Sequence, residues 1–119
     1  MNEKYQKLIF YMMNIKYMRI LLMFDLPIET KTQQKQYSKF HKSLISHGFV
    51  MIQYSIYVKI VNTESKVQRV IDKIKVDLPS DGNIRILAIT DKQYQDMIFL
   101  VGDKNLNEQI NGDERYIKC

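Results

Sequence analysis

The amino-acid sequence predicts an α+β fold in which one antiparallel sheet carries two helices on one of its faces. Apolar segments with strand or helix periodicity follow one another in the order β-α-β-β-α-β, and one more apolar segment comes after them. The chain has 119 residues, of which 45% are apolar, with two prolines and four glycines. This length and composition are typical of a single compact domain.

The first predicted strand covers residues 18–24. Five consecutive apolar residues, from Ile20 to Phe24, have the length and composition of a strand that is buried on both faces. Asp25 follows directly, and Pro27 stops the strand. A carboxylate at the end of a buried strand leaves two interpretations open, because it either forms the turn or belongs to a functional site.

A helix is predicted between Thr30 and His47, because apolar residues recur there at helical spacing. Thr30 is suited to cap its N-terminus, and Gly48 is suited to end it. The apolar stripe consists of Tyr37, Phe40, Leu44 and Ile45. Four lysines cluster on the opposite face of this helix, namely Lys31, Lys35, Lys39 and Lys42.

Residues 49–61 are rich in β-branched and aromatic side chains, which favour strands. Because thirteen residues are many for one strand, we expect two short strands joined by a tight turn or bulge at residues 53–55. Asn62 and Thr63 then offer a cap for a second helix, which ends at Pro79. The apolar stripe of this helix is formed by Val67, Val70, Ile71, Ile74 and Leu78.

The last part of the predicted fold comprises a turn at residues 80–83, a strand at residues 84–90, a polar turn at residues 91–96 and an extra strand. The elements before the extra strand make a ferredoxin-like arrangement, which leaves one sheet face without helices. The extra strand is formed by Met97, Ile98, Phe99, Leu100 and Val101. We expect a two-fold homodimer in which this strand crosses to the partner and the helix-free faces pack together.

The motifs of several classes of site are absent: the sequence has no Gly-rich phosphate loop, no paired cysteines and no nucleophile elbow. For His41, packing is the favoured interpretation. The chain carries 18 basic and 13 acidic residues, a net charge of +5, which favours polyanionic partners. No acidic residue lies between Glu29 and Glu64, so the lysine face makes a positive stripe suited to a phosphate backbone rather than an ordinary solvated surface.

Asp25 is the remaining candidate for chemistry. A hard cation such as Mg²⁺ is held by one or two carboxylates together with water and substrate phosphate oxygens. In a two-fold dimer, two copies of Asp25 could face one shared ion. The position of Asp25 by itself does not decide between a metal ligand and a turn residue.

Four segments together resemble the CRISPR-associated protein 2 family, in the branch that accompanies type II systems. They are "YMRILLMFDLP" (17–27), "KQYSKFHKSLISHGFVMIQYSIY" (35–57), "LPSDGNIRILAIT" (78–90) and "QYQDMIFLVG" (93–102). Each motif is weak alone, but the four in this order are specific. The resemblance covers about residues 17–102.

This resemblance implies a ferredoxin-like homodimer that acts in spacer acquisition beside dimers of the CRISPR-associated integrase, with double-stranded DNA along its basic surface. It also implies a magnesium-dependent endonuclease that cuts DNA or RNA, with Asp25 as the catalytic and metal-binding residue. Arginines of many relatives correspond to Lys35 and Lys39, which keep the charge but lose the bidentate phosphate geometry. Tyr57 matches a family aromatic, for which core packing is expected.

Three functions therefore stay open: a scaffold without chemistry, a metal-dependent phosphodiesterase, and a stand-alone toxin-like endoribonuclease on the same fold. We expect an N-terminal extension at residues 1–15, the domain at residues 16–102 and a polar tail at residues 103–119. The start codon is open between Met1, Met12, Met13 and Met18. The single cysteine, Cys119, forms no internal disulfide, and no segment is suited to export or anchoring, so we expect a cytoplasmic protein without membrane contact.

Overall fold

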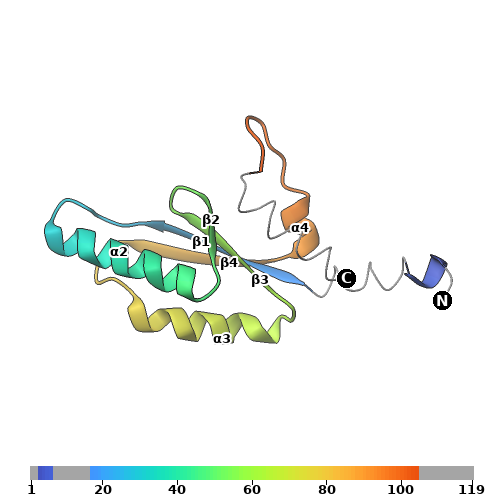
Figure 1. The fold of residues 1–119 in the computed structure, drawn as a ribbon, viewed down its shortest axis with the longest axis horizontal. Coiled ribbons are helices and arrows are strands. Elements are labelled where there is room, and N and C mark those ends of the chain that lie inside the picture. The colour runs from blue at the N-terminus through green and yellow to red at the C-terminus, as the bar shows by residue number, and fades with distance from the viewer. Residues whose placement is uncertain (1–2, 7–16, 105–119) are drawn as a thin grey trace.

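The structure is a computed structural model that describes residues 3–6 and 17–104. It has a four-stranded antiparallel sheet in the order β2-β3-β1-β4, with two long helices on one face and a short helix on the other (Figure 1). The strands are β1 (Met18–Asp25), β2 (Val50–Gln53), β3 (Ile56–Val61) and β4 (Asn83–Thr90). The helices are α2 (Lys31–Ser46), α3 (Ser65–Ile74), the 3-10 turn η1 (Lys75–Asp77) and α4 (Asp91–Gln95). The predicted ferredoxin-like α+β fold is confirmed.

Strand β1 lies inside the sheet, between β3 and β4, and Leu21 stands opposite Val58 on one side and Leu87 on the other. Side chains alternate between the two faces of a strand. The faces of β1 therefore differ: Leu22 and its alternate neighbours point toward α2 and α3, whereas Leu21 and Met23 point to the other side. Leu21 packs against a second cluster on that side and Met23 is half-buried, so both faces of β1 are at least partly covered, which explains the uninterrupted apolar run in the sequence.

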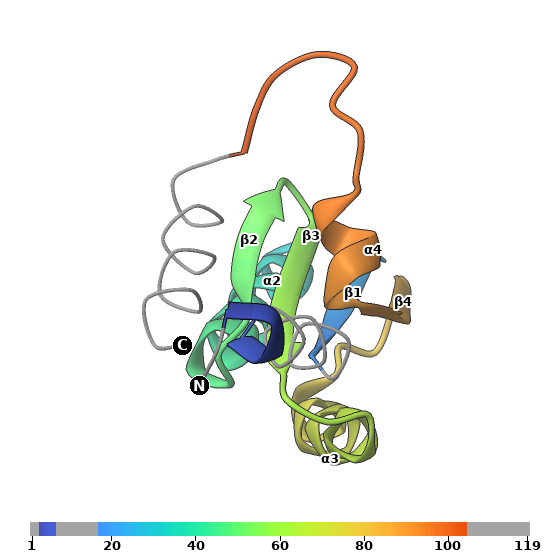
Figure 2. The same ribbon diagram turned by 90° about the vertical axis from the view of Figure 1, so that its right-hand side faces the viewer.

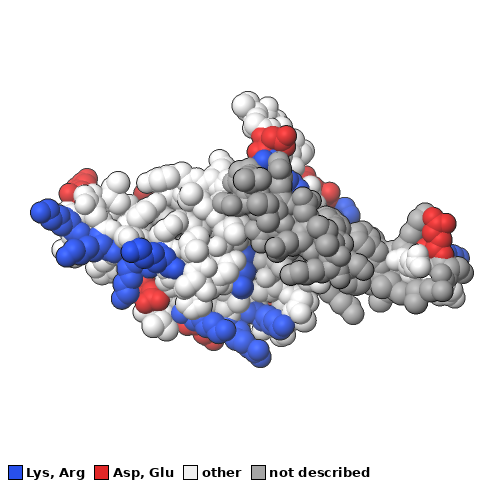
Figure 3. Space-filling view, viewed as in Figure 1, with Lys and Arg blue, Asp and Glu red and all other residues white. Residues whose placement is uncertain are grey.

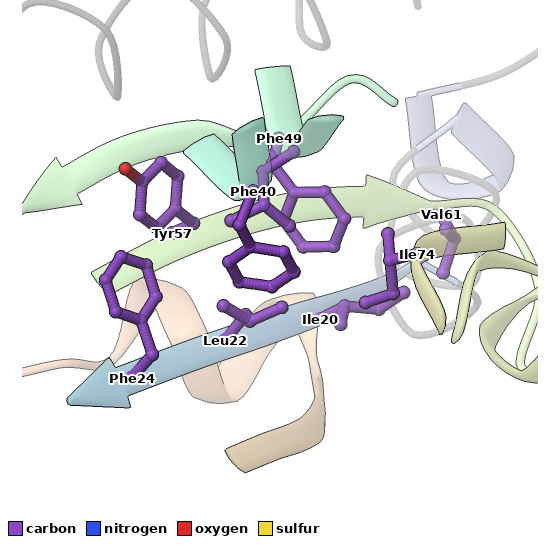
Figure 4. Close-up of a cluster of buried hydrophobic side chains, with 9 residues drawn as sticks. Ile20, Leu22, Phe24, Phe40, Phe49, Tyr57, Val61 and Ile74 are labelled. Carbon is purple, nitrogen blue, oxygen red and sulfur yellow. The ribbon is translucent and has the colours of Figure 1, made fainter. Parts of the chain in front are cut away.

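The main core fills the space between the sheet and the long helices (Figure 4). Phe24 stacks on Tyr57 with ring centroids 5.6 Å apart, and it meets the edge of Phe40 at 5.8 Å. Tyr57 is fully buried, as expected for a packing role. The buried members of this cluster are Ile20, Leu22, Phe24, Phe40, Leu44, Phe49, Tyr57, Val61 and Ile74.

Helix α2 has the predicted boundaries. The Thr30 hydroxyl accepts from the Gln33 backbone N–H, and the Gln33 side chain accepts from the Thr30 N–H, which forms a capping box. Gly48 follows the helix with a φ of +87°, a conformation that favours glycine. The prediction that Ile45 belongs to the buried stripe is wrong, because it lies about 140° around the helix from Phe40 and is 47% exposed.

Helix α3 begins later than predicted. Its first residue is Ser65, and the preceding Glu64 makes no side-chain cap. The expected cap at Asn62 and Thr63 is therefore wrong, because the Thr63 hydroxyl pairs with the Ser65 hydroxyl at 3.0 Å instead of accepting from a helix N–H. Leu78 is also not part of the buried stripe, since η1 separates it from α3 and it is 47% exposed.

The two edges of the sheet differ. The predicted join between β2 and β3 is present, with Ser55 at a φ of +66°, and the β2–β3 register shifts between Met51 and Gln53. Strand β2 is four residues long and irregular, whereas β4 has eight residues in continuous register with β1. Within the described chain, no strand pairs with the outer side of β4.

The polar turn predicted at residues 91–96 is wrong, because these residues form helix α4 with its own capping box between Thr90 and Gln93. Figure 1 shows α4 on the side of the sheet opposite α3. Tyr94 of α4 packs there with Ile52 and Val58 in a second, smaller cluster. The face that we expected to be free of helices is thus partly covered.

The extra strand predicted from Met97 to Val101 is not a strand in the described chain, where these residues form a loop that projects away from the sheet (Figure 2). All five are exposed, Leu100 and Val101 to 93%. A strand at an edge requires a neighbour, so pairing with a partner remains a prediction. The N-terminal extension and the polar tail lie mostly outside the described residues. In the described part, no helix has the length and apolarity to span a membrane.

Candidate nucleic-acid and metal site

Helix α2 displays the four predicted lysines on its exposed side, and Figure 3 shows basic side chains gathered over this part of the molecule. Lys31, Lys35 and Lys42 form no ion pair with another described residue. We call these three residues the α2 stripe. Unpaired cations in a row are available to phosphate groups, which bind proteins largely through such contacts.

From the sequence we expected no carboxylate close to the four lysines of this helix, and Lys39 departs from that expectation. Its Nζ lies 3.8 Å from Asp77 Oδ1, and the Ser43 hydroxyl donates to Asp77 Oδ2 at 2.8 Å. The 3-10 turn η1 brings Asp77 beside α2 although the two are far apart in sequence. Lys39 is 71% exposed, so this ion pair is weak and leaves the ammonium accessible.

Asp25 is exposed at the end of β1, where it stands opposite Asn83 of β4. By strand alternation it belongs to the sheet face opposite α2 and α3. It lines a cavity of about 280 Å³ together with Met23, Phe24, Asn83 and Arg85. No hydrogen bond or ion pair joins its side chain to another described residue, so the carboxylate is open to solvent and ligands.

The residues around Asp25 fit a magnesium ion only in part. Among the described residues, no three His, Cys, Asp or Glu side chains gather closely enough to hold a metal. Asp25 therefore supplies one hard oxygen ligand, and water, substrate phosphate oxygens or a second copy of the chain would have to supply the others. This arrangement is compatible with the shared ion that we expected, and it does not form a complete site in one chain.

Arg85 was not singled out from the sequence, yet it lines the same cavity as Asp25. It stands opposite Met23 in the β1–β4 ladder and is exposed. Its side chain is suited to hold a phosphate beside the carboxylate. The sequence feature that could have identified Arg85 is its position as the one charged residue in the otherwise mostly apolar strand "IRILAIT".

The two histidines serve the packing of α2. His41 Nδ1 is hydrogen-bonded to the Tyr57 hydroxyl, and His47 Nδ1 lies 2.8 Å from the Ser43 carbonyl oxygen. Burial raises the pKa of Tyr57. The pKa of Tyr37 is raised to about 12, mainly by burial and in addition by a hydrogen bond with Tyr54. The contact of His41 with the fully buried Tyr57 favours a structural role for this histidine.

A buried ion pair fixes α4 on the sheet. Arg19 Nε donates to Asp91 Oδ1 at 2.7 Å, and the Arg19 guanidinium lies 4.4 Å from the centre of the Tyr94 ring. The two charged residues are 72 positions apart in sequence, so no local pattern indicates their contact. Through this pair, the start of the segment that leads to Met97 is held against β1.

Comparison with known proteins identifies close relatives. A family model described as "CRISPR associated protein Cas2" matches residues 18–97. The chain is 45% identical to the "CRISPR-associated endoribonuclease Cas2" of Ligilactobacillus salivarius strain UCC118, over 84% of this chain and 98% of the relative. Proteins with the same name from Campylobacter jejuni and Streptococcus mutans UA159 are 42% and 40% identical, over 86% and 84% of this chain and 71% and 91% of the relatives.

Proposed function

Because this chain belongs to the Cas2 family of CRISPR-associated proteins, we propose that it acts in CRISPR adaptation. In this role the chain would form a homodimeric scaffold that binds double-stranded DNA. The scaffold would join the CRISPR-associated integrase to capture and insert spacers. The observation that carries the proposal is the α2 stripe, which is exposed and forms no ion pair with another described residue. Such a stripe contacts phosphates without reading bases, as a protein that accepts many sequences requires.

We further propose that the chain is a metal-dependent endonuclease in its own right. The relatives are named endoribonucleases, which favours RNA as a substrate beside DNA. Bound Mg²⁺ would supply an activated water and neutralise charge on the scissile phosphate. Asp25 would hold the ion, and Arg85, which lines the same cavity from the neighbouring strand β4, would orient the phosphate.

The scaffold and the nuclease make different demands on Asp25. A scaffold needs the shape and charge of the surface, whereas hydrolysis needs the carboxylate as a ligand. Because Asp25 is exposed and no described residue is bonded to its side chain, asparagine at this position should leave the fold nearly unchanged. We therefore expect Asp25→Asn to abolish magnesium-dependent cleavage and to retain spacer acquisition.

The experiment compares Asp25→Asn with Asp81→Asn, which removes an exposed carboxylate from the turn before β4 that does not line the Asp25 cavity. Cleavage of RNA and duplex DNA in magnesium is measured with the purified proteins, and acquisition is measured together with the integrase. Cleavage that persists in Asp25→Asn would identify Asp25 as a turn residue. Loss of acquisition in a folded Asp25→Asn dimer would refute the separation of the two functions.

The stand-alone toxin-like endoribonuclease remains the alternative to a role in adaptation. The two differ in their genomic neighbourhood, because an adaptation protein acts with an integrase. An adjacent integrase gene, and co-purification of its product with this chain, would support adaptation. Cleavage of RNA by a chain that never associates with an integrase would support the alternative.

A further inference from the structure

A second basic region lies at the end of the sheet opposite Asp25. A groove of about 450 Å³ runs between β3 and α3 near the point where β3 ends. Among the described residues that line it there is no carboxylate, and four of them are basic: Lys59, Lys66, Arg69 and Lys73. Figure 3 shows basic side chains along the part of the surface that α3 forms, separate from those over α2.

Three of the four cations form a row along α3. Lys66, Arg69 and Lys73 are separated by three and then four residues, so their side chains follow one side of the helix. With a rise of 1.5 Å per residue, the row is about 10 Å long. Phosphates of one DNA strand follow each other at about 3.4 Å along the duplex axis, so the row matches about three of them.

Lys59 comes from β3, on the sheet face that α2 and α3 cover, and is partly buried. A Cβ at Gly48, which follows the C-cap of α2, would lie 2.5 Å from its Nζ, so the end of the lysine side chain passes close to this glycine. Burial and the neighbouring Lys73 ammonium lower the pKa of Lys59. An anion beside the ammonium would offset both effects, because opposite charge favours the charged form.

Like the lysines of the α2 stripe, the groove cations have no carboxylate partner among the described residues. None of the four forms an ion pair with a described residue, whereas Lys75 pairs with Asp72 and Lys92 pairs with Asp96. Four like charges around one groove repel each other unless an anion binds between them. The groove is therefore built to receive negative charge.

We propose that the groove between β3 and α3 binds the phosphate backbone of a nucleic-acid strand, as a second phosphate-binding surface beside the α2 stripe. The identification of the groove ligand as nucleic acid rests on the proposed function. The length of the α3 row favours a polymer over a small anion, because a single phosphate would contact only part of it. Binding here carries no base specificity, since the contacts are to phosphate.

The test uses the full chain and three pairs of substitutions. Arg69→Ala/Lys73→Ala removes two groove charges, and Lys31→Ala/Lys35→Ala removes two charges of the α2 stripe. The matched control, Lys75→Ala/Lys92→Ala, removes two exposed lysines that already have carboxylate partners, and each double variant lowers the net charge from +5 to +3. Affinity for a short DNA duplex is measured at a series of salt concentrations.

If the groove binds phosphate, Arg69→Ala/Lys73→Ala should reduce the slope of log affinity against log salt by about 1.8 for each groove in contact, at 0.9 per phosphate. With this smaller slope, the fall in DNA affinity on going from about 50 to about 200 mM salt becomes roughly tenfold smaller. The control should retain the original slope. Both groove residues are exposed, so folding should be unaffected, and Arg69→Gln/Lys73→Gln serves if the alanine variant does not fold.

The outcomes separate this inference from the proposed function. A groove variant that matches the control, beside an α2 variant with weakened binding, would overturn the groove and leave the DNA platform on α2. The reverse result would support the groove and overturn the platform. If neither variant differs from the control, both proposals fail.

Discussion

Replacing Asp91 by alanine should destabilise the protein by about 3–5 kcal/mol, because it removes one partner of a charge pair that the fold buries. Arg19 Nε lies 2.7 Å from Asp91 Oδ1, and the two side chains are only 3% and 1% exposed. At this depth the lost carboxylate is not replaced by bulk water. The stacking of Arg19 on Tyr94 persists in the variant, and a desolvated contact of this kind contributes about 2 kcal/mol.

The double variant Arg19→Met/Asp91→Leu provides the internal control. Replacement of a buried ion pair by apolar residues of similar volume is often neutral or stabilising, because the desolvation cost disappears with both charges. The loss of the contact with Tyr94 opposes this gain by about 2 kcal/mol. We therefore expect the double variant to be within about 2 kcal/mol of the original chain, and more stable than Asp91→Ala.

Urea unfolding followed by far-UV circular dichroism measures these free energies of unfolding. All variants must be compared at one protein concentration, because association with a partner would add to the apparent stability. A loss below about 1 kcal/mol for Asp91→Ala would refute the reasoning, because it would place the pair in the range of solvated surface ion pairs. A double variant that is less stable than Asp91→Ala would refute it as well, since removal of both charges also removes their desolvation cost.

Two further predictions concern pH and association. Because the pKa of Tyr37 is raised to about 12, its neutral hydroxyl stabilises the fold fully below the ordinary pKa of 10.0, and stability should fall as the pH rises through about 12. Urea unfolding at each pH should show a smaller fall for Tyr37→Phe, and equal falls would contradict the assignment. Ile98→Asp/Leu100→Asp changes residues that are 82% and 93% exposed in the single chain, so it should shift sedimentation at micromolar concentration from dimer to monomer without unfolding. Sedimentation of the original chain as a stable monomer would contradict the dimer.

Local signals in the sequence were sufficient for most elements of the fold. Strand β1 was predictable from the apolar run and Pro27, and α2 from a stripe bounded by Thr30 and Gly48, because strand burial and helix caps are short-range properties. The Thr90–Gln93 capping box of α4 was also present in the sequence, but the polar composition of the segment favoured a turn.

The features that were missed depend on residues brought together by the fold. The ion pair of Arg19 with Asp91, and that of Lys39 with Asp77, join elements that share no sequence pattern. The contribution of Arg85 to the Asp25 cavity follows from the β1–β4 register, which the sequence does not specify alone. Residues 97–101 form a loop in the described chain, and the strand that we predict for them would require a second chain as neighbour.

The difference between the two sheet edges has a consequence for how copies of the chain can associate. The short, irregular β2 offers a poor template for a further strand, whereas the continuous β4 offers a good one. If residues 97–101 pair with β4 of a second chain, as we predict, each chain would have one strand to donate and one edge to accept a strand. Such monomers either polymerise or close into a ring, and the two-fold pair is the smallest ring. After the first contact of a pair, the second becomes intramolecular, with an effective concentration in the millimolar range, so ring closure outcompetes polymerisation in dilute solution.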